Sequence, residues 1–190
     1  VAQQVVLSGC LTAIVTPFKA SGRLDVDALV RHARWMVGEG VKGIVVNGTT
    51  GESATLRTDE KIDAMNAVFD AVGDRATVVG GAGNNCTWES LEFLELANER
   101  ARLHAIMSVV PYYNKPNQRG IVRHFHEVCD RSRFPVVLYN VPGRTVVGMS
   151  VDAMVDACAH PNVCGFKEAS GDLHLAAKLF GRVRDGVALL

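Results

Sequence analysis

The stretch that sets the fold class is Asn162-Val163-Cys164-Gly165-Phe166-Lys167, a short apolar run that ends in a lysine. Such a run predicts a buried strand, and alternation along a strand places Gly165 and Lys167 on the same face. A buried amine is costly unless it has a partner or a chemical task. A desolvated lysine loses basicity and can attack a carbonyl carbon to form a Schiff base. A lone lysine at a strand end more often extends into solvent, so the neighbouring segments must decide between the two interpretations.

Comparable apolar runs recur along the chain and alternate with segments of helical periodicity. Strands are expected near residues 10–16, 42–47, 76–81, 104–110, 134–140, 162–167 and 187–190. Helices are expected near residues 25–39, 58–73, 87–102, 118–131, 150–159 and 172–184. Nearly continuous apolar strands that alternate with helices indicate an α/β fold with a parallel sheet.

Two α/β architectures fit this alternation, and the strand ends distinguish them. A doubly wound nucleotide-binding sheet carries a glycine-rich phosphate turn after its first strand, whereas here the first strand leads into Thr16-Pro17-Phe18. A (β/α)8 TIM barrel gathers its active-site residues at the carboxyl ends of successive strands. Chemically capable side chains follow the expected strands in this way: Thr16, Thr49, Thr50, Asn84, Asn85, Tyr112, Tyr113, Tyr139, Asn140 and Lys167. The barrel is therefore the predicted fold.

The length of the chain accounts for most of such a barrel, but not for all of it. A (β/α)8 barrel typically has about 250 residues, and this chain has 190. We therefore expect residues 1–190 to form a single barrel domain that is incomplete at its C-terminal end. It would supply about six βα units and the start of the seventh strand.

The composition excludes several classes of function. Lys plus Arg and Asp plus Glu both number 20, so no net field attracts nucleic acid or an anionic membrane. The apolar runs are too short to span a bilayer, and the N-terminus lacks the regions of a signal peptide. The 5 cysteines form no CxxC pair, and His124 and His126 are expected to be solvated surface histidines on different sides of a helix. We expect a cytoplasmic protein without a bound metal and without nucleic-acid or membrane partners.

Two loops at expected strand ends carry residues that could bind a small substrate. The second strand is followed by Gly48-Thr49-Thr50-Gly51-Glu52-Ser53, whose backbone amides and hydroxyls could hold a carboxylate, although an ordinary polar loop would look the same. The fourth strand ends in Pro111-Tyr112-Tyr113-Asn114-Lys115-Pro116. Its adjacent tyrosines could carry protons, cover the rim of the barrel or form a subunit interface.

The fifth strand ends in Tyr139-Asn140-Val141-Pro142-Gly143-Arg144-Thr145. Alternation directs the hydroxyl of Tyr139 towards the same space as Lys167. The turn at Pro142-Gly143 presents Arg144, whose guanidinium group suits a carboxylate. A solvated arginine on a turn is the common alternative, but the position one strand before the lysine favours a functional role.

Four motifs together resemble the dihydrodipicolinate synthase family, within the N-acetylneuraminate lyase superfamily of class I aldolases. They are GTTGES at 48–53, PYYNKP at 111–116, YNVPGRT at 139–145 and KEASGD at 167–172, and the resemblance extends over about 9–190. GTTGE and the strand-end lysine are shared across the superfamily, whereas the arginine of YNVPGRT points to the synthase. The resemblance implies a TIM barrel that condenses pyruvate with L-aspartate 4-semialdehyde to 4-hydroxy-tetrahydrodipicolinate, the first committed step of lysine and diaminopimelate biosynthesis.

The resemblance also assigns residues to the pyruvate half of this reaction. Lys167 corresponds to the lysine that forms the Schiff base, and Tyr139 corresponds to the tyrosine that relays protons. Thr49 corresponds to the threonine that links the two tyrosines of the relay. Thr50, with Gly48, corresponds to the binding site of the pyruvate carboxylate. No metal or organic cofactor is implied, because the iminium ion serves as the electron sink.

Two further residues are assigned by the resemblance to the second substrate and to assembly. Arg144 corresponds to the arginine that receives the carboxylate of aspartate semialdehyde. Tyr113 corresponds to the tyrosine lent across a tight dimer interface to the neighbour's active site, which implies a homotetramer built as a dimer of dimers. The alternatives are another pyruvate-dependent aldolase of the superfamily, acting on a sugar acid or a keto acid, and a truncated, catalytically silent subunit. A nucleotide-binding domain ranks last, because the sequence has no phosphate loop.

Family members that are inhibited by lysine bind it at the dimer interface, and the resemblance extends to part of that pocket. The corresponding residues are Ser53, Ala54, Asn85, Glu89 and Tyr112. Thr58 and Lys61, however, stand where strongly inhibited members usually have histidines. A cation at Lys61 repels the ammonium group of lysine, so we expect weak or absent feedback inhibition. A titration of the activity with L-lysine tests this expectation, and inhibition at sub-millimolar lysine would refute it.

Overall fold

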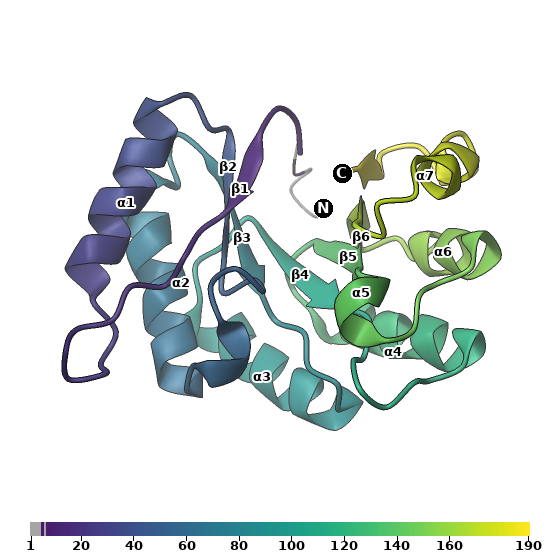
Figure 1. Ribbon diagram of the computed structural model, residues 1–190, viewed down its shortest axis with the longest axis horizontal. Coiled ribbons are helices and arrows are strands. Elements are labelled where there is room, and N and C mark those ends of the chain that lie inside the picture. The colour runs from purple at the N-terminus through teal and green to yellow at the C-terminus, as the bar shows by residue number, and fades with distance from the viewer. Residues whose placement is uncertain (1–4, 6) are drawn as a thin grey trace. The chain divides into compact units, whose positions relative to one another are not determined.

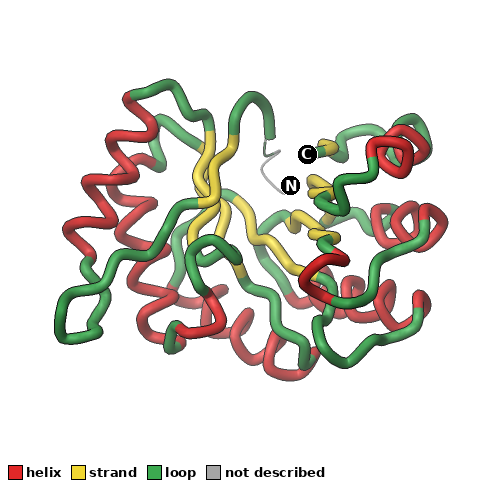
Figure 2. The backbone as a smooth tube through the Cα atoms, in the orientation of Figure 1, coloured by secondary structure: helices red, strands yellow, loops and turns green. Residues whose placement is uncertain are grey.

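The computed structural model describes residue 5 and residues 7–190, along which strands and helices alternate (Figures 1 and 2). The strands are β1 (Leu11–Ala13), β2 (Gly43–Val46), β3 (Thr77–Gly81), β4 (Ala105–Val109), β5 (Val136–Asn140), β6 (Val163–Glu168) and β7 (Ala188–Leu189). The helices are α1 (Val26–Gly38), α2 (Thr58–Val72), α3 (Thr87–Arg100), α4 (Gln118–Arg131), α5 (Pro142–Thr145), α6 (Val151–Cys158) and α7 (Leu173–Leu179), with a short 3₁₀ helix, η1, at Ser53–Thr55. This order confirms the expected α/β class, in which the βα units of a TIM barrel follow one another up to the start of the seventh strand.

The described residues divide into two compact units. The amino-terminal unit comprises Val5–Gly81 and Leu96–Ile106, and the carboxyl-terminal unit comprises Ala82–Glu95 and Met107–Leu190. Helix α3 and strand β4 contribute residues to both units. The division does not test the expectation of a single domain over residues 1–190, which stays a prediction.

Strands β1, β2 and β3 of the amino-terminal unit pair in parallel and in the order of the chain. All residues of β2 are buried, because β2 lies between two strands and packs against α2, which itself packs against α1 (Figure 1). Gly43 opens β2 opposite Leu11 and Thr77. A Cβ atom at Gly43 would lie 2.8 Å from Cγ of Leu11 and 3.1 Å from the carbonyl oxygen of Thr77. Only glycine therefore lets these strands approach so closely.

The strands of the carboxyl-terminal unit also pair in parallel and in chain order. Directly after β4, the N–H of Val110 donates to the carbonyl oxygen of Tyr139 on β5 at 3.0 Å. Strand β5 pairs with β6, and β6 pairs with β7. The register between β5 and β6 shifts between Val136 and Val137 and is regular from there to the carboxyl ends of both strands. Helices α4, α6 and α7 lie next to one another beside these strands (Figure 1).

One side chain ties the start of β6 to its neighbours. The Nδ2 atom of Asn162 lies 3.0 Å from the carbonyl oxygens of Cys129, Ser132 and Phe134. Its two hydrogens therefore serve three acceptors at the end of α4 and in the chain that leads into β5. Each such bond contributes about 1 kcal/mol net, and leaving the carbonyl groups without a donor would cost more. The amino end of β6 is fixed in this way, at the end of the strand away from Lys167.

A short helix replaces the turn that the sequence predicted around Pro142-Gly143. Proline suits the first position of α5, because its φ is preset and its missing N–H is not needed there. The hydroxyl of Thr145 lies 2.8 Å from the carbonyl oxygen of Val147 and 3.1 Å from that of Val141, so these two acceptors share its hydrogen. Val146 then ends the helix in a left-handed conformation with φ of 67°. Arg144 consequently lies on a turn of helix with fixed ends.

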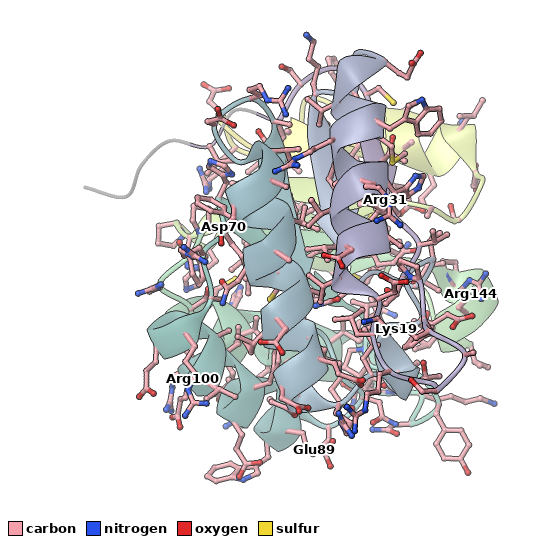
Figure 3. The ribbon with its side chains drawn as sticks, turned by 90° about the vertical axis from the view of Figure 1, so that its left-hand side faces the viewer. Lys19, Arg31, Asp70, Glu89, Arg100 and Arg144 are labelled. Carbon is pink, nitrogen blue, oxygen red and sulfur yellow. The ribbon has the colours of Figure 1, made fainter. Side chains whose placement is uncertain are left out.

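Charged side chains cover the outer faces of α1 and α2 (Figure 3). Arg31 on α1 and Asp70 on α2 are both exposed, and Asp70 forms an ion pair of 2.6 Å with Arg102. Exposed ion pairs of this kind contribute only about 0–1 kcal/mol to the free energy of folding. The charged side chains therefore serve chiefly to solvate the outer faces of the two helices. Within residue 5 and residues 7–190, the helices are all too short or too polar to cross a membrane.

The expectation of two solvated histidines on α4 is wrong for His124. Its side chain is only 3% exposed, and its Nδ1 atom lies 2.8 Å from the hydroxyl of Thr87. The two-residue spacing does separate His124 from the half-buried His126, but the face of His124 is the one that packs into the core. It shares this apolar stripe with Ile121, Phe125 and Val128. The spacing of three, four and seven residues from Ile121 carried this signal, and the pairwise argument about the two histidines overlooked it.

The burial of His124 predicts a loss of stability in acid. Burial lowers its pKa from 6.5 to about 4, because the charged imidazolium is desolvated. Between these pH values the imidazole of His124 is therefore protonated in the unfolded chain and neutral in the folded chain. The stabilisation present above pH 6.5 is lost as the pH falls towards 4, by roughly 3 kcal/mol in the limit.

The substitution His124→Gln should flatten this dependence. We expect the melting temperature of the variant to fall less steeply than that of the wild type as the pH is lowered from neutral. The exposed His174 on α7 provides the control, because His174→Gln should leave the wild-type slope in place. An unchanged slope in His124→Gln would contradict the assignment.

Candidate active site

Lys167 and Tyr139 meet at the carboxyl ends of β6 and β5. They are partners in the parallel register, and the Nζ atom of Lys167 lies 4.3 Å from the centroid of the Tyr139 ring. An ammonium group over an aromatic face is attracted by the ring quadrupole. Tyr139 is only 6% exposed, so its ring forms a fixed wall beside the amine. The structure therefore brings these two side chains together, with the amine over the ring of the tyrosine.

The surroundings of Lys167 alter its acid–base behaviour. The residue is half-buried, and this burial lowers its pKa below the ordinary value of 10.5, because the charged form loses hydration. The ring of Tyr139 acts in the opposite sense, since it favours the ammonium form, but desolvation is the dominant cause. A lowered pKa increases the fraction of neutral amine, which is the nucleophilic form.

A second pair of polar residues follows immediately along the same two strands. Asn140 stands opposite Glu168 in the register, and its Nδ2 atom donates to Oε2 of Glu168 at 2.7 Å. The other carboxylate oxygen, Oε1, accepts the N–H of Ser170 at 2.6 Å. The Oδ1 atom of Asn140 accepts the N–H of Met149 at 3.1 Å. The sequence indicated Asn140 only as a polar strand end and gave no role to Glu168, because their pairing depends on the register.

Arg144 lies on α5, close to the carboxyl end of β5 that carries Tyr139. Its side chain is exposed, and Figure 3 shows it at the surface of this short helix. The chain returns from α5 along a segment held by Gln118, whose side chain donates to the carbonyl oxygen of Gly148 at 2.9 Å and accepts the N–H of Ser150 at 2.7 Å. The guanidinium group is thus available to a carboxylate while its backbone is fixed.

Tyr113 projects from the segment after β4. It is 82% exposed, and its φ of 72° is a left-handed conformation that is uncommon for an aromatic residue. Such backbone strain persists only where neighbouring structure holds it. Asn114 provides part of that support, because its side chain donates to the carbonyl oxygen of Asn85 at 2.7 Å and accepts from the Asn85 side chain at 3.2 Å.

Two of the residues assigned to the lysine pocket in the carboxyl-terminal unit, Glu89 and Tyr112, form hydrogen bonds to Asn84. The Nδ2 atom of Asn84 donates to Oε2 of Glu89 at 2.6 Å, and its Oδ1 atom accepts a long bond of 3.5 Å from the hydroxyl of Tyr112. Asn85 is adjacent and is held by Asn114. The structure therefore links Glu89 and Tyr112 through Asn84, whereas the hydrogen bonds of Asn85 go to Asn114.

The loop after β2 belongs to the amino-terminal unit. The loop turns tightly, and the N–H of Gly51 donates to the carbonyl oxygen of Gly48 at 3.1 Å. The hydroxyl of Thr16, beyond β1, donates to the carbonyl oxygen of Gly51 at 2.6 Å and anchors the loop. Thr49 and Thr50 in this loop are exposed.

The predicted site residues thus fall into two sets. Gly48, Thr49, Thr50, Ser53 and Ala54 lie in the amino-terminal unit, and Asn85, Glu89, Tyr112, Tyr113, Tyr139, Arg144 and Lys167 lie in the carboxyl-terminal unit. In the part of the chain that the structure describes, histidine, cysteine and acidic side chains form no group of three that could hold a metal ion.

The sequence is similar to that of a defined enzyme family. A model of the dihydrodipicolinate synthetase family matches residues 6–190. The chain is 45% identical over 172 residues to the 4-hydroxy-tetrahydrodipicolinate synthase of Acidothermus cellulolyticus, covering 90% of this chain and 56% of that protein. It is 46% identical over 172 residues to 4-hydroxy-tetrahydrodipicolinate synthase 2 of Streptomyces coelicolor, covering 90% of this chain and 57% of that protein. The chain therefore spans a little more than half the length of these curated relatives.

Solved structures show the same fold. The crystal structure of dihydrodipicolinate synthase from Bacillus anthracis has a TM-score of 0.92 at 35% identity, covering 97% of this chain and 63% of that chain. The dihydrodipicolinate synthase of Acinetobacter baumannii, described as complexed with pyruvate, has a TM-score of 0.88 at 34% identity and covers 97% of this chain and 64% of that chain. Family, relatives and fold agree over almost all of the chain, which therefore belongs to the dihydrodipicolinate synthetase family.

Proposed function

We propose that the protein condenses pyruvate with L-aspartate 4-semialdehyde to 4-hydroxy-tetrahydrodipicolinate, through a Schiff base at Lys167. The observation that carries the proposal is the half-buried amine of Lys167, 4.3 Å from the ring of Tyr139 at the paired ends of two strands. The two curated relatives are named for this synthase, and the Acinetobacter relative is described with pyruvate. We place the reaction at the first committed step of lysine and diaminopimelate biosynthesis, as the resemblance implies.

The proposed first half of the reaction activates pyruvate. An amine with the ordinary pKa of 10.5 is neutral in about one molecule in 3000 at pH 7, and the burial of Lys167 raises that fraction. The neutral amine attacks the keto carbon of pyruvate, Tyr139 passes a proton to the departing hydroxyl, and water leaves as the iminium forms. Loss of a methyl proton then gives an enamine, with the iminium nitrogen as the electron sink, so this chemistry needs no cofactor.

The proposed second half joins the two substrates. The enamine carbon attacks the aldehyde carbon of the semialdehyde, whose carboxylate pairs with the exposed guanidinium group of Arg144. The amine of the semialdehyde then attacks the imine carbon, which closes the ring and releases Lys167. Thr49 in the proton relay, and Thr50 with Gly48 at the pyruvate carboxylate, complete the proposed set. Their place is supported by the exposure of both threonines on the loop after β2.

The proposal extends to assembly and location. Tyr113 is 82% exposed on a strained backbone, which suits a side chain that enters the active site of a neighbouring subunit. We therefore propose a homo-oligomer, built as a dimer of dimers as the resemblance implies. It would act in the cytoplasm on small molecules, without a nucleic-acid or membrane partner.

Trapping with pyruvate and borohydride tests the Schiff base directly. We expect reduction in the presence of pyruvate to leave a stable adduct on the peptide that contains Lys167, measured by mass spectrometry. The variant Lys167→Arg should lose the adduct, because a guanidinium group is not a nucleophile at neutral pH. The exposed Lys178 on α7 provides the matched control, and Lys178→Arg should retain the adduct in full. A folded wild type that forms no adduct would overturn the assignment of Lys167.

The variant Arg144→Ala separates the synthase from another pyruvate-dependent aldolase. We expect its rate of pyruvate trapping to stay within about twofold of wild type, while condensation with aspartate semialdehyde falls about tenfold to hundredfold, the worth of one charge-assisted hydrogen-bonded contact. Arg119 on α4 is also exposed, and Arg119→Ala should leave both rates unchanged. Unimpaired condensation with aspartate semialdehyde in Arg144→Ala would contradict the role of Arg144, whereas a wild type that traps pyruvate but does not condense it with aspartate semialdehyde would favour another pyruvate-dependent aldolase.

A further inference from the structure

We propose that Asn140 and Glu168 form a positioning clamp that holds Lys167 and the segment of Arg144 in their working arrangement. The inference rests on the proposed function. Asn140 directly follows Tyr139 on β5, Glu168 directly follows Lys167 on β6, and the two form the next pair in the register. The hydrogen bond of 2.7 Å between their side chains joins the carboxyl ends of the two strands.

The clamp lies behind the reactive pair. Successive side chains of a strand point to opposite faces, so Asn140 and Glu168 project away from the face that carries Tyr139 and Lys167. Asn140 is fully buried, with 0% of its surface exposed. It does not face a substrate bound at the amine of Lys167 and therefore acts through its neighbours. Neither residue takes part in the steps proposed above. A buried amide next to a carboxylate costs free energy unless the two are hydrogen-bonded, as they are here.

One arm of the clamp fixes the chain on the far side of Lys167. The carbonyl oxygen of Asn140 accepts the N–H of Ala169 at 2.9 Å, and Oε1 of Glu168 accepts the N–H of Ser170 at 2.6 Å. The backbone that leaves β6 is thus bound both to β5 and to the clamp itself. The direction in which the lysine side chain leaves the strand depends on this backbone.

The other arm fixes the segment that carries Arg144. The Oδ1 atom of Asn140 accepts the N–H of Met149 at 3.1 Å, at the point where the chain returns from α5. Residues 141–149 therefore leave β5 next to Asn140 and come back to the same side chain. The amide group of Asn140 thus donates to Glu168, on the strand of Lys167, and accepts from Met149, in the segment of Arg144. It therefore links the residue proposed to bind pyruvate to the segment proposed to bind the semialdehyde.

The amide and the carboxylate of the clamp can be exchanged between positions 140 and 168 with almost no change in side-chain shape. This exchange provides a test. Asn140→Asp places a second carboxylate against Glu168 with no hydrogen between them. Glu168→Gln leaves only one acceptor oxygen for two donors, the amide of Asn140 and the N–H of Ser170. In the double variant every donor again meets an acceptor: the new glutamine amide faces the new aspartate, its oxygen accepts from Ser170, and the second aspartate oxygen accepts from Met149.

The readout is the rate of adduct formation at Lys167 with saturating pyruvate, measured across pH and expressed per folded molecule. We expect each single variant to react about tenfold to hundredfold more slowly even on the alkaline plateau, where the amine is neutral, because small displacements of reacting groups cost rates of this order. The double variant should return to within about threefold of wild type. Asn140→Ala also loses the bond to Met149, so it should in addition raise the KM for aspartate semialdehyde.

The variant Asn162→Ala is the matched control for a loss of stability alone. Asn162 is another hydrogen-bonded asparagine of the same unit, but it serves the amino end of β6. It should lower the melting temperature and leave the adduct rate per folded molecule unchanged. If Asn140→Asp does not fold, Glu168→Gln and the double variant decide.

Three results would overturn the clamp. They are single variants with wild-type plateau rates, single variants in which only the pH midpoint moves, and a double variant no faster than either single variant. The last would mean that residue identity matters and hydrogen-bond geometry does not. A wild type that forms no pyruvate adduct overturns the proposed function together with this inference, whereas a reactive wild type with unaffected variants overturns the clamp alone.

Discussion

The parallel pairing of β5 with β6 is the constraint on which the candidate site depends. It sets Tyr139 opposite Lys167, and a slip of one residue would turn one of these side chains to the other face of the strands. The irregularity in this pairing lies at the opposite end, between Val136 and Val137, where Asn162 ties the chain to α4. The register is regular where the reactive groups lie. The backbone ladder therefore specifies the contact of 4.3 Å between amine and ring more strongly than any attraction between the two side chains.

The position of Lys167 balances two opposing demands. Complete burial would make an unpaired ammonium group very costly, whereas full exposure would leave its pKa near 10.5 and almost all of the amine protonated. The half-buried position lowers the pKa by desolvation and leaves part of the side chain exposed. The ring of Tyr139 limits the cost of the protonated form, because its face attracts a cation. The same tyrosine therefore makes the resting lysine tolerable and lies next to the atom that is proposed to react.

The sequence predicted the positions of helices and strands well, but it predicted poorly which side chains contact one another. Hydrophobic periodicity located the strands and most of the helices, and the strand ends indicated Lys167 and Tyr139, because parallel strands present their carboxyl ends together. Helix α7 ends at Leu179, before the predicted limit of 184, and Gly181 in a left-handed conformation follows it. The buried face of a helix, as for His124, depends on what packs against it. The Asn140 and Glu168 contact depends on a register that is formed by residues far apart in the chain, so periodicity could not reveal it.

The two functions proposed for the carboxyl-terminal unit are placed by different kinds of structure. The amine of Lys167 depends on a strand ladder, in which many apolar sequences give the same backbone geometry. Arg144 depends on an excursion of the chain through α5 that begins and ends at Asn140. On the proposed function, replacing that excursion would alter the binding of the second substrate and leave the strand ladder that carries Lys167 in place. This separation agrees with the expectation from the resemblance that the strand-end lysine is shared across the superfamily and that the arginine points to the synthase. Asn140 joins the strand ladder to the segment of Arg144. A substitution of Asn140 is therefore expected to affect both halves of the proposed reaction.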